Sequence, residues 1–151
     1  MSAKLDAYIQ KLEATEMISV KHESRGKRVY LTFSKKVPHE PGVYVIYDCA
    51  KDAKKPKPFY VGEAGDLLGR LTFLFRCNSI ENPHPCQKRY AEVVGKKISQ
   101  ITFEGFCKRF RVKFDSTKKY GGRLEIEDAL KRKYGTNCAA FYKKLFSEEF
   151  N

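Results

Sequence analysis

The pattern of hydrophobic and polar positions predicts a small antiparallel sheet. Residues 42–48 (GVYVIYD) are rich in β-branched and aromatic side chains, and FYVGE at 59–63 has the same character. The segment between them, AKDAKKPKP, holds two prolines and four lysines and is typical of a turn. These two segments therefore predict an antiparallel hairpin. A third strand is expected at 106–114, where Phe106, Phe110, Val112 and Phe114 would share one face, and an edge strand at 28–33.

Apolar residues at helical spacing predict helices between and around these strands. They are expected at 3–15, 65–76, 86–100 and 123–135, the last with early acidic residues, late basic residues and a stop at Gly135. A further amphipathic segment covers 138–150. The order of elements predicts one α+β domain over residues 1–151, with a central antiparallel sheet of about three strands flanked by helices.

The positive net charge of the chain indicates which class of partner it binds. The chain carries 30 Lys and Arg against 18 Asp and Glu, a net charge of +12, which favours a polyanion such as nucleic acid. No apolar run is long enough to span a membrane, and the N-terminal segment reads as an exposed amphipathic helix. Five scattered cysteines without a CxxC pair predict reduced thiols and a cytoplasmic protein, although His84 between Cys77 and Cys86 leaves metal binding open.

Five landmarks follow one another on the predicted elements. They are Gly42-Val43-Tyr44, Tyr60-Val61-Gly62, Arg70 on the following helix, a glutamate on a later helix, and Asn137. In this order they resemble the GIY-YIG nuclease superfamily, which includes homing endonucleases, the nuclease module of a bacterial excision-repair enzyme and small restriction endonucleases. The resemblance covers about residues 41–137, with an N-terminal extension and a C-terminal helix outside it.

The resemblance implies a role for each landmark. Tyr44 would position or deprotonate the attacking water, and Tyr60 would support it near the phosphate. Arg70 would hold the scissile phosphate with its planar fork of donors. Asn137 would brace the site. Tyrosine is a poor base until nearby cations lower its pKa from about 10.

The same resemblance implies one helical glutamate as the only protein ligand of a single Mg²⁺, with Mn²⁺ as the alternative. Two glutamates compete for this role. Glu125 lies twelve residues before Asn137, a spacing similar to that of the repair enzymes. Glu127 has the family's apolar neighbours and would lie beside the core face of its helix. We expect Glu127 to be the ligand and keep Glu125 as the second candidate.

Further residues are candidates for contact with DNA. Gly42 and Gly62 would leave room for backbone or DNA to approach closely. Lys55 and Lys57 in the turn, and Arg109 and Arg111 on the third strand, belong to two basic clusters expected to contact phosphates. Two departures from the family pattern stand out: the turn between the tripeptides is long, and Leu74 stands where a family histidine is often found. His84 is either a substrate-side residue or an ordinary loop residue.

The sequence thus predicts a Mg²⁺-dependent DNA endonuclease with a restriction or structure-specific repair role. Cutting both strands of a duplex would favour a homodimer. Two alternatives stay open: a catalytically silent nucleic-acid-binding module, and a nuclease subunit that is inactive until it docks on a partner.

Overall fold

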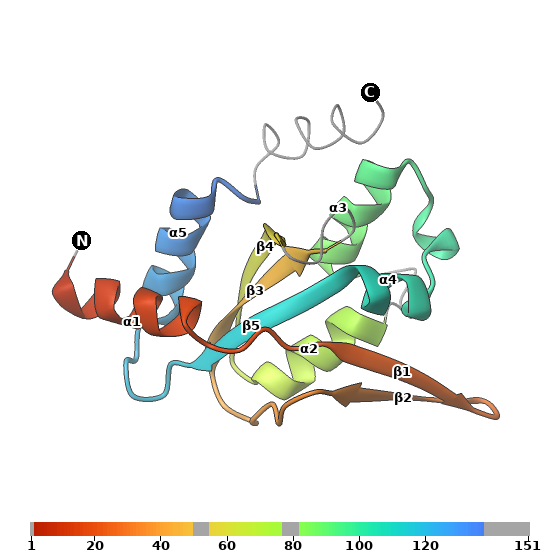
Figure 1. Cartoon of the computed structure of the whole chain (residues 1–151), viewed down its shortest axis with the longest axis horizontal. Helices are drawn as coiled ribbons and strands as arrows, with labels where there is room; N and C mark the ends of the chain where they lie inside the picture. The colour runs from red at the N-terminus through yellow and green to blue at the C-terminus, as the bar shows by residue number, and fades with distance from the viewer. Residues whose placement is uncertain (1, 50–54, 77–81, 138–151) are drawn as a thin grey trace.

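The computed structural model describes residues 2–49, 55–76 and 82–137. Its elements follow one another in a mixed order (Figure 1). They are α1 (Ala3–Glu13), β1 (Val20–Arg25), β2 (Arg28–Phe33), β3 (Gly42–Asp48), β4 (Lys57–Ala64), α2 (Leu67–Arg76), α3 (Pro85–Val94), η1 (Ile98–Gln100), α4 (Phe103–Arg109), β5 (Phe110–Ser116) and α5 (Arg123–Tyr134). The predicted helix at 138–150 lies outside the described residues.

A three-stranded antiparallel sheet in the order β4-β3-β5 forms the centre, which confirms the predicted α+β class. Six of the seven β3 residues are buried, because both faces of this strand are covered. Tyr44 lies opposite Gly62 on β4 and Phe114 on β5, and Ile46 lies opposite Tyr60. The predicted hairpin of the two tripeptides is therefore the core of the sheet.

Two apolar clusters pack on opposite faces of the sheet, so the molecule has three layers (Figure 1). Val43, Val45 and Val61 face α1 and α5. Tyr44 and Ile46 face the other cluster, to which α2, α3 and α4 contribute the buried residues Leu67, Leu71, Leu74, Phe75, Cys86, Val93, Phe106 and Cys107. Helix α1 was expected to be exposed, but its apolar side is buried in the first cluster.

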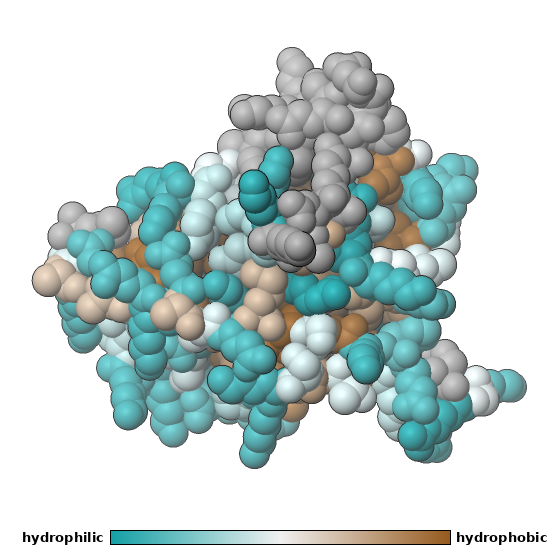
Figure 2. Space-filling model, viewed as in Figure 1, coloured by the Kyte–Doolittle hydropathy of each residue, from teal (hydrophilic) through white to brown (hydrophobic). Residues whose placement is uncertain are grey.

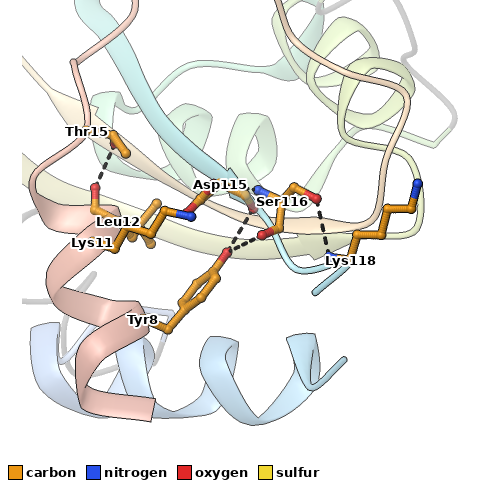
Figure 3. A network of polar contacts seen from close by, with 7 residues as sticks. All are labelled: Tyr8, Lys11, Leu12, Thr15, Asp115, Ser116 and Lys118. Carbon is orange, nitrogen blue, oxygen red and sulfur yellow. Dashed lines mark hydrogen bonds and ion pairs between the residues drawn. The ribbon is translucent and has the colours of Figure 1, made fainter. Parts of the chain in front are cut away.

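Hydrogen bonds fasten α1 to the end of β5 (Figure 3). The Tyr8 hydroxyl lies 3.0 Å from the carbonyl oxygen of Asp115 and 3.1 Å from that of Ser116, and Lys11 pairs with the Asp115 carboxylate at 3.4 Å. Just beyond the helix, Ile18 exchanges two backbone hydrogen bonds with Val112, at 2.8 and 3.0 Å. The N-terminal segment thus packs α1 on one face of the sheet, and its Ile18 backbone bonds to the outer edge of β5 near the middle of that strand.

Three sequence predictions need correction. The third strand begins at Phe110 rather than Phe106, because residues 103–109 form helix α4. The segment at 28–33 is a strand, but it pairs with β1, which was not predicted, in a separate two-stranded sheet. The helix expected to reach residue 100 ends at Gly95, which adopts a left-handed conformation with φ of 68°.

Among the described residues, Cys86 and Cys107 are buried and Cys49 is partly buried, each as a free thiol, while Cys77 and Cys138 lie outside the described ranges. Within the ranges that the structure describes, no helix has both the length and the apolar character needed to cross a membrane. Hydrophilic side chains cover much of the face in Figure 2.

Candidate active site

The β3–β4 hairpin brings the two motif tyrosines together on one face of the sheet. Tyr44 and Tyr60 belong to neighbouring positions of the paired strands, and their ring centroids lie 6.5 Å apart with the planes tilted by 26°. Side chains on paired antiparallel strands share a face, so the sequence order of the motif is enough to make the rings converge. The first part of the predicted constellation is therefore assembled by local structure alone.

A buried histidine completes this pair from a distant segment. His84 precedes α3 and caps it: its Nδ1 accepts the backbone N–H of Cys86 at 3.0 Å. Its Nε2 lies 2.9 Å from the Tyr44 hydroxyl oxygen. A neutral imidazole carries one proton, and Nδ1 is occupied as an acceptor, so the proton resides on Nε2 and is donated to Tyr44. The helix cap therefore fixes the tautomer that the tyrosine meets.

Burial controls the protonation of this pair. Burial raises the pKa of Tyr44 well above 10, Tyr60 raises it further, and Arg70 lowers it by its charge and a hydrogen bond. The pKa of His84 falls from 6.5 to about 3, first because it is buried and second because Arg70 is positively charged. Both groups are therefore neutral at neutral pH, and Tyr44, only 1% exposed, is a hydrogen-bonding group rather than an ionised base.

The depressed pKa of His84 predicts a specific loss of stability in acid. Between pH 6.5 and about 3 the unfolded chain binds a proton at His84 that the folded chain does not, so stability falls as the pH is lowered through this window. The slope from this one group approaches about 1.4 kcal/mol per pH unit. Urea unfolding of the wild type and of His84→Gln, measured from pH 7 to pH 4, should give a shallower pH dependence for the variant.

Glutamine can still accept from the backbone and donate to the tyrosine, so this variant removes the titration while keeping the hydrogen bonds. Loss of the cap would lower stability equally at every pH. Parallel curves for the two proteins would show that His84 is not held neutral by the fold.

Gly62 makes room for the Tyr44 ring. A Cβ built on Gly62 would collide with the Cζ and hydroxyl oxygen of Tyr44. The room that the sequence predicted at this glycine, for backbone or DNA, is occupied by the protein's own Tyr44 side chain. Gly42 likewise lets other groups approach closely, because a Cβ there would collide with the Asp115 carbonyl oxygen and the Leu67 side chain.

Gly62→Ala is expected to lower the free energy of unfolding by about 1–3 kcal/mol, since the buried Tyr44 ring must shift and strain its bond to His84. Chemical denaturation followed by circular dichroism measures this. Gly65→Ala is the matched control, because a Cβ at Gly65 meets nothing within 4 Å. Equal stability of the two variants would contradict the packing role.

Arg70 lies at an open cleft next to the tyrosines. It is exposed on the first turn of α2, and the cleft of about 500 Å³ is lined by Glu63, Ala64, Gly65, Asp66, Gly69, Arg70 and Phe73. Asp66, just before the helix, bonds to His39 at 3.1 Å and accepts the Gly69 N–H at 3.4 Å. The start of the helix is thus held in place, and the guanidinium is available to a ligand in the cleft.

The predicted residues Arg70 and Glu127 both act electrostatically on the Tyr60 hydroxyl. Burial raises the pKa of this partly buried tyrosine to about 12, and the Cys86 thiol and the Glu127 carboxylate raise it as well. The positive charges of Arg70 and Arg89 act in the opposite direction. Charged groups from α2, α3 and α5 therefore act on one hydroxyl of the outer strand β4.

The structure separates the two candidate glutamates. The Glu127 side chain is 19% exposed. Burial raises its pKa first, Lys131 lowers it and Glu63 raises it. The Glu127 carboxylate in turn raises the pKa of Tyr60. Glu125 is exposed, and its carboxylate accepts a hydrogen bond from the Tyr120 hydroxyl at 3.5 Å. The Tyr120 ring packs against Tyr8 of α1, so Glu125 faces that helix. Only Glu127 shares the surroundings of Tyr60.

The donor set around Glu127 fits a hard divalent cation. Burial is the first cause that raises the pKa of Glu127, and the negative charge of Glu63 raises it further, while Lys131 lowers it. Glu63 is also bound by Arg123 at 2.5 Å. No cluster of three or more His, Cys, Asp or Glu occurs in the described ranges, so a cation at Glu127 would keep water and substrate oxygens as most of its ligands.

Asn137 braces the edge strand from the end of the described chain. Its side-chain amide accepts the backbone N–H of Val61 at 3.0 Å and donates to the Val61 carbonyl at 2.7 Å. Asn137 has a φ of 65°, a left-handed conformation that asparagine tolerates better than most residues. The amide therefore pairs with β4 as a neighbouring strand would, directly beside Tyr60.

Two of the predicted DNA contacts have partners within the protein. Arg109 belongs to α4 and forms a two-pronged ion pair with Asp48, at 3.0 and 2.9 Å, with each side chain 14% exposed. Arg111 donates to the carbonyls of Cys107, Lys108 and Phe110 and so closes the end of α4. Both guanidinium groups are therefore engaged within the protein, and their contact with phosphates stays a prediction. Lys55 and Lys57 are exposed, and their contact with DNA stays a prediction.

Sequence reasoning missed Glu63 and Arg89. Glu63 follows the second tripeptide directly, but strand alternation places it on the same face as Val61, which is opposite to the face of Tyr60, so the strand pattern did not indicate it. Arg89 acts on Tyr60 from α3, and no local pattern distinguishes it from other basic residues of that helix. Comparison with protein-family models, with curated proteins and with solved structures found no match for this chain.

Proposed function

We propose that the protein is a metal-dependent DNA endonuclease that hydrolyses phosphodiester bonds at the edge of β4. The observation that carries this proposal is that Arg70, exposed at a cleft, acts electrostatically on the Tyr60 hydroxyl together with Arg89 and Glu127. Two guanidinium groups suit a phosphate, and a carboxylate beside them suits a hard cation. The hydroxyl between them lies where a water or a phosphate oxygen would bind.

Each residue then has a defined task. Arg70, exposed at the cleft, binds the scissile phosphate and stabilises the charge that develops in the transition state. Tyr60 holds the attacking water by its hydroxyl. Tyr44 lies behind it and is kept in place by the proton that His84 donates. This differs from the role expected for Tyr44, because its burial and its raised pKa are unsuited to a base that meets water directly.

Glu127 would hold the cation, with Glu63 as a nearby second carboxylate. A divalent cation bound there supplies positive charge to the phosphate and lowers the pKa of a water. Lys131, which pairs with Glu127 at 3.4 Å, neutralises part of the carboxylate charge in its absence. Asn137 bonds to the backbone of Val61 and so keeps strand β4 in place next to Tyr60.

DNA is the proposed polyanion. The net charge of +12 attracts any nucleic acid, and the cleft at Arg70 is open enough for a backbone to enter. Whether the role is restriction or repair depends on the substrate form that is cut.

The test is incubation of the purified protein with supercoiled plasmid, linear duplex and branched DNA, in Mg²⁺ or in EDTA. We expect cleavage that requires Mg²⁺, with discrete fragments for a restriction enzyme and nicks at junctions for a repair enzyme. An Arg70→Ala preparation excludes a contaminating nuclease. Salt-sensitive binding without cleavage in Mg²⁺ or Mn²⁺ would replace this proposal with a silent binding module or a partner-dependent subunit.

A further inference from the structure

The β1–β2 hairpin forms a two-stranded ribbon that projects from the body of the molecule (Figure 1). Its strands are joined at the pair Arg25 and Arg28 by Gly26 and Lys27, with Gly26 at a φ of 64°. Between residues 20 and 33 the ribbon carries four Lys or Arg and one acidic residue. A two-stranded ribbon alone is marginally stable in water, so its base must be supported by the rest of the fold.

One face of the ribbon provides that support. Val20 and Phe33 face each other at the base and belong to the core, with Phe33 set edge-on against Phe75. Next along the ribbon, His22 stacks on Phe103 of α4 with the ring centroids 5.6 Å apart. The ribbon is therefore held in a fixed direction by its inner face.

The other face is open and predominantly basic. Paired residues of an antiparallel ribbon share a face, and the outward pairs alternate with the inward ones. All six outward residues are exposed; they are Lys21, Glu23, Arg25, Arg28, Tyr30 and Thr32. In Figure 2 the lobe formed by the ribbon is largely hydrophilic.

The contacts within this outward face leave it positively charged. Glu23 is bound by Arg25 at 3.3 Å, so the one acidic group is already neutralised. The Arg25 guanidinium also lies 5.5 Å from the ring centroid of Tyr30, which is 41% exposed. The exposed Lys21 and Arg28, together with Arg25 beside the Tyr30 ring, offer positive charge to the phosphates of a nucleic acid.

We propose that the β1–β2 ribbon is a DNA-binding arm, whose outward face contacts the sugar–phosphate backbone of a duplex. The proposal rests on the proposed function, since it assigns a second surface to the same substrate. A two-stranded ribbon is narrow enough to follow the major groove, and its exposed Lys and Arg match the phosphate charge. An anionic membrane is less suited to this face, because Tyr30 is its only large apolar group.

The test uses the full chain with a fluorescein-labelled DNA duplex in EDTA, so that binding is measured without cleavage. The variant Lys21→Gln/Arg28→Gln removes two outward charges. Lys118→Gln/Lys119→Gln is the matched control, since these two lysines are exposed on the segment after β5, away from the ribbon. Fluorescence anisotropy at several salt concentrations gives the affinity and the salt slope.

We expect the ribbon variant to lose at least about tenfold in affinity and to show a salt slope lower by about 2, whereas the control keeps the wild-type slope. Lys21→Arg/Arg28→Lys, which keeps the charge, should bind as the wild type does. Equal losses in both Gln variants, or none in the ribbon variant, would overturn the arm. A ribbon variant that loses binding to phosphatidylglycerol vesicles but not to duplex would overturn it too.

Plasmid cleavage in Mg²⁺ separates this proposal from the first. A wild type that cuts DNA while the ribbon variant binds and cuts equally well would refute the arm and leave the nuclease intact. A wild type that binds the duplex through the ribbon but never cuts would keep the arm and refute the nuclease. A wild type that neither binds nor cuts DNA would refute both.

Discussion

Arg70→Ala is expected to reduce the rate of DNA cleavage by about 10³-fold, with little change in the affinity for DNA. Arg70 is exposed at the cleft and acts on both tyrosine hydroxyls. Its guanidinium lines the cleft where a phosphate would bind, and it also lowers the pKa of both tyrosine hydroxyls. Single-turnover cleavage of a plasmid at saturating protein isolates the chemical step from binding.

Two further variants make this result specific. Arg76→Ala removes an exposed arginine from the last turn of the same helix and should cleave as the wild type does. Arg70→Lys keeps the charge but not the planar fork of donors, and should recover part of the rate. If all three variants cleaved equally fast, Arg70 would not be a catalytic residue. If Arg70→Ala only weakened binding, its role would be general attraction of DNA.

Glu127→Gln is expected to reduce Mg²⁺-dependent cleavage by at least about 10²-fold, because it removes the carboxylate proposed to hold the cation. The amide keeps the shape of the side chain and its place on α5. Raising the Mg²⁺ concentration should restore part of the lost rate if the variant still binds the cation weakly. The rate measured against Mg²⁺ concentration therefore reports on the ligand as well as on the chemistry.

Glu125→Gln is the matched comparison on the same helix. Glu125 is exposed and contacts Tyr120 rather than Tyr60, so this variant should keep both the wild-type rate and its Mg²⁺ dependence. The reverse result, with loss at Glu125 and none at Glu127, would place the cation on the α1 side of the helix. It would also mean that the cation does not bind next to Tyr60 and Arg70.

The strands that carry the tyrosines were predictable because they are rich in β-branched and aromatic side chains and because the turn between them holds prolines and lysines. The third strand was misplaced because two periods meet in one segment. Phe103, Phe106 and Phe110 follow helical spacing, whereas Phe110, Val112 and Phe114 follow strand spacing, and Phe110 belongs to both. Strand β1 has one apolar residue, Val20, and becomes a strand by pairing with β2, so its own pattern carried little signal.

The part of the candidate site that comes from one continuous segment of the chain was predictable. Tyr44, Tyr60 and Arg70 come from one continuous segment, in which hairpin and helix geometry decide their neighbours. His84 bonds to Tyr44 across 40 positions of sequence, and its burial depends on how α3 packs. The same holds for the distinction between Glu125 and Glu127, since it depends on the rotation of α5 against the sheet.

Both outer edges of the central sheet are occupied at their middle, at Val61 by the Asn137 amide and at Val112 by the Ile18 backbone. An open edge strand is a template on which a second chain can add its own strand, and it is a common start of aggregation. At these two positions the backbone groups that such a chain would need are already bonded. A homodimer that extended the sheet from one copy to the next at these positions would first require Asn137 or Ile18 to leave.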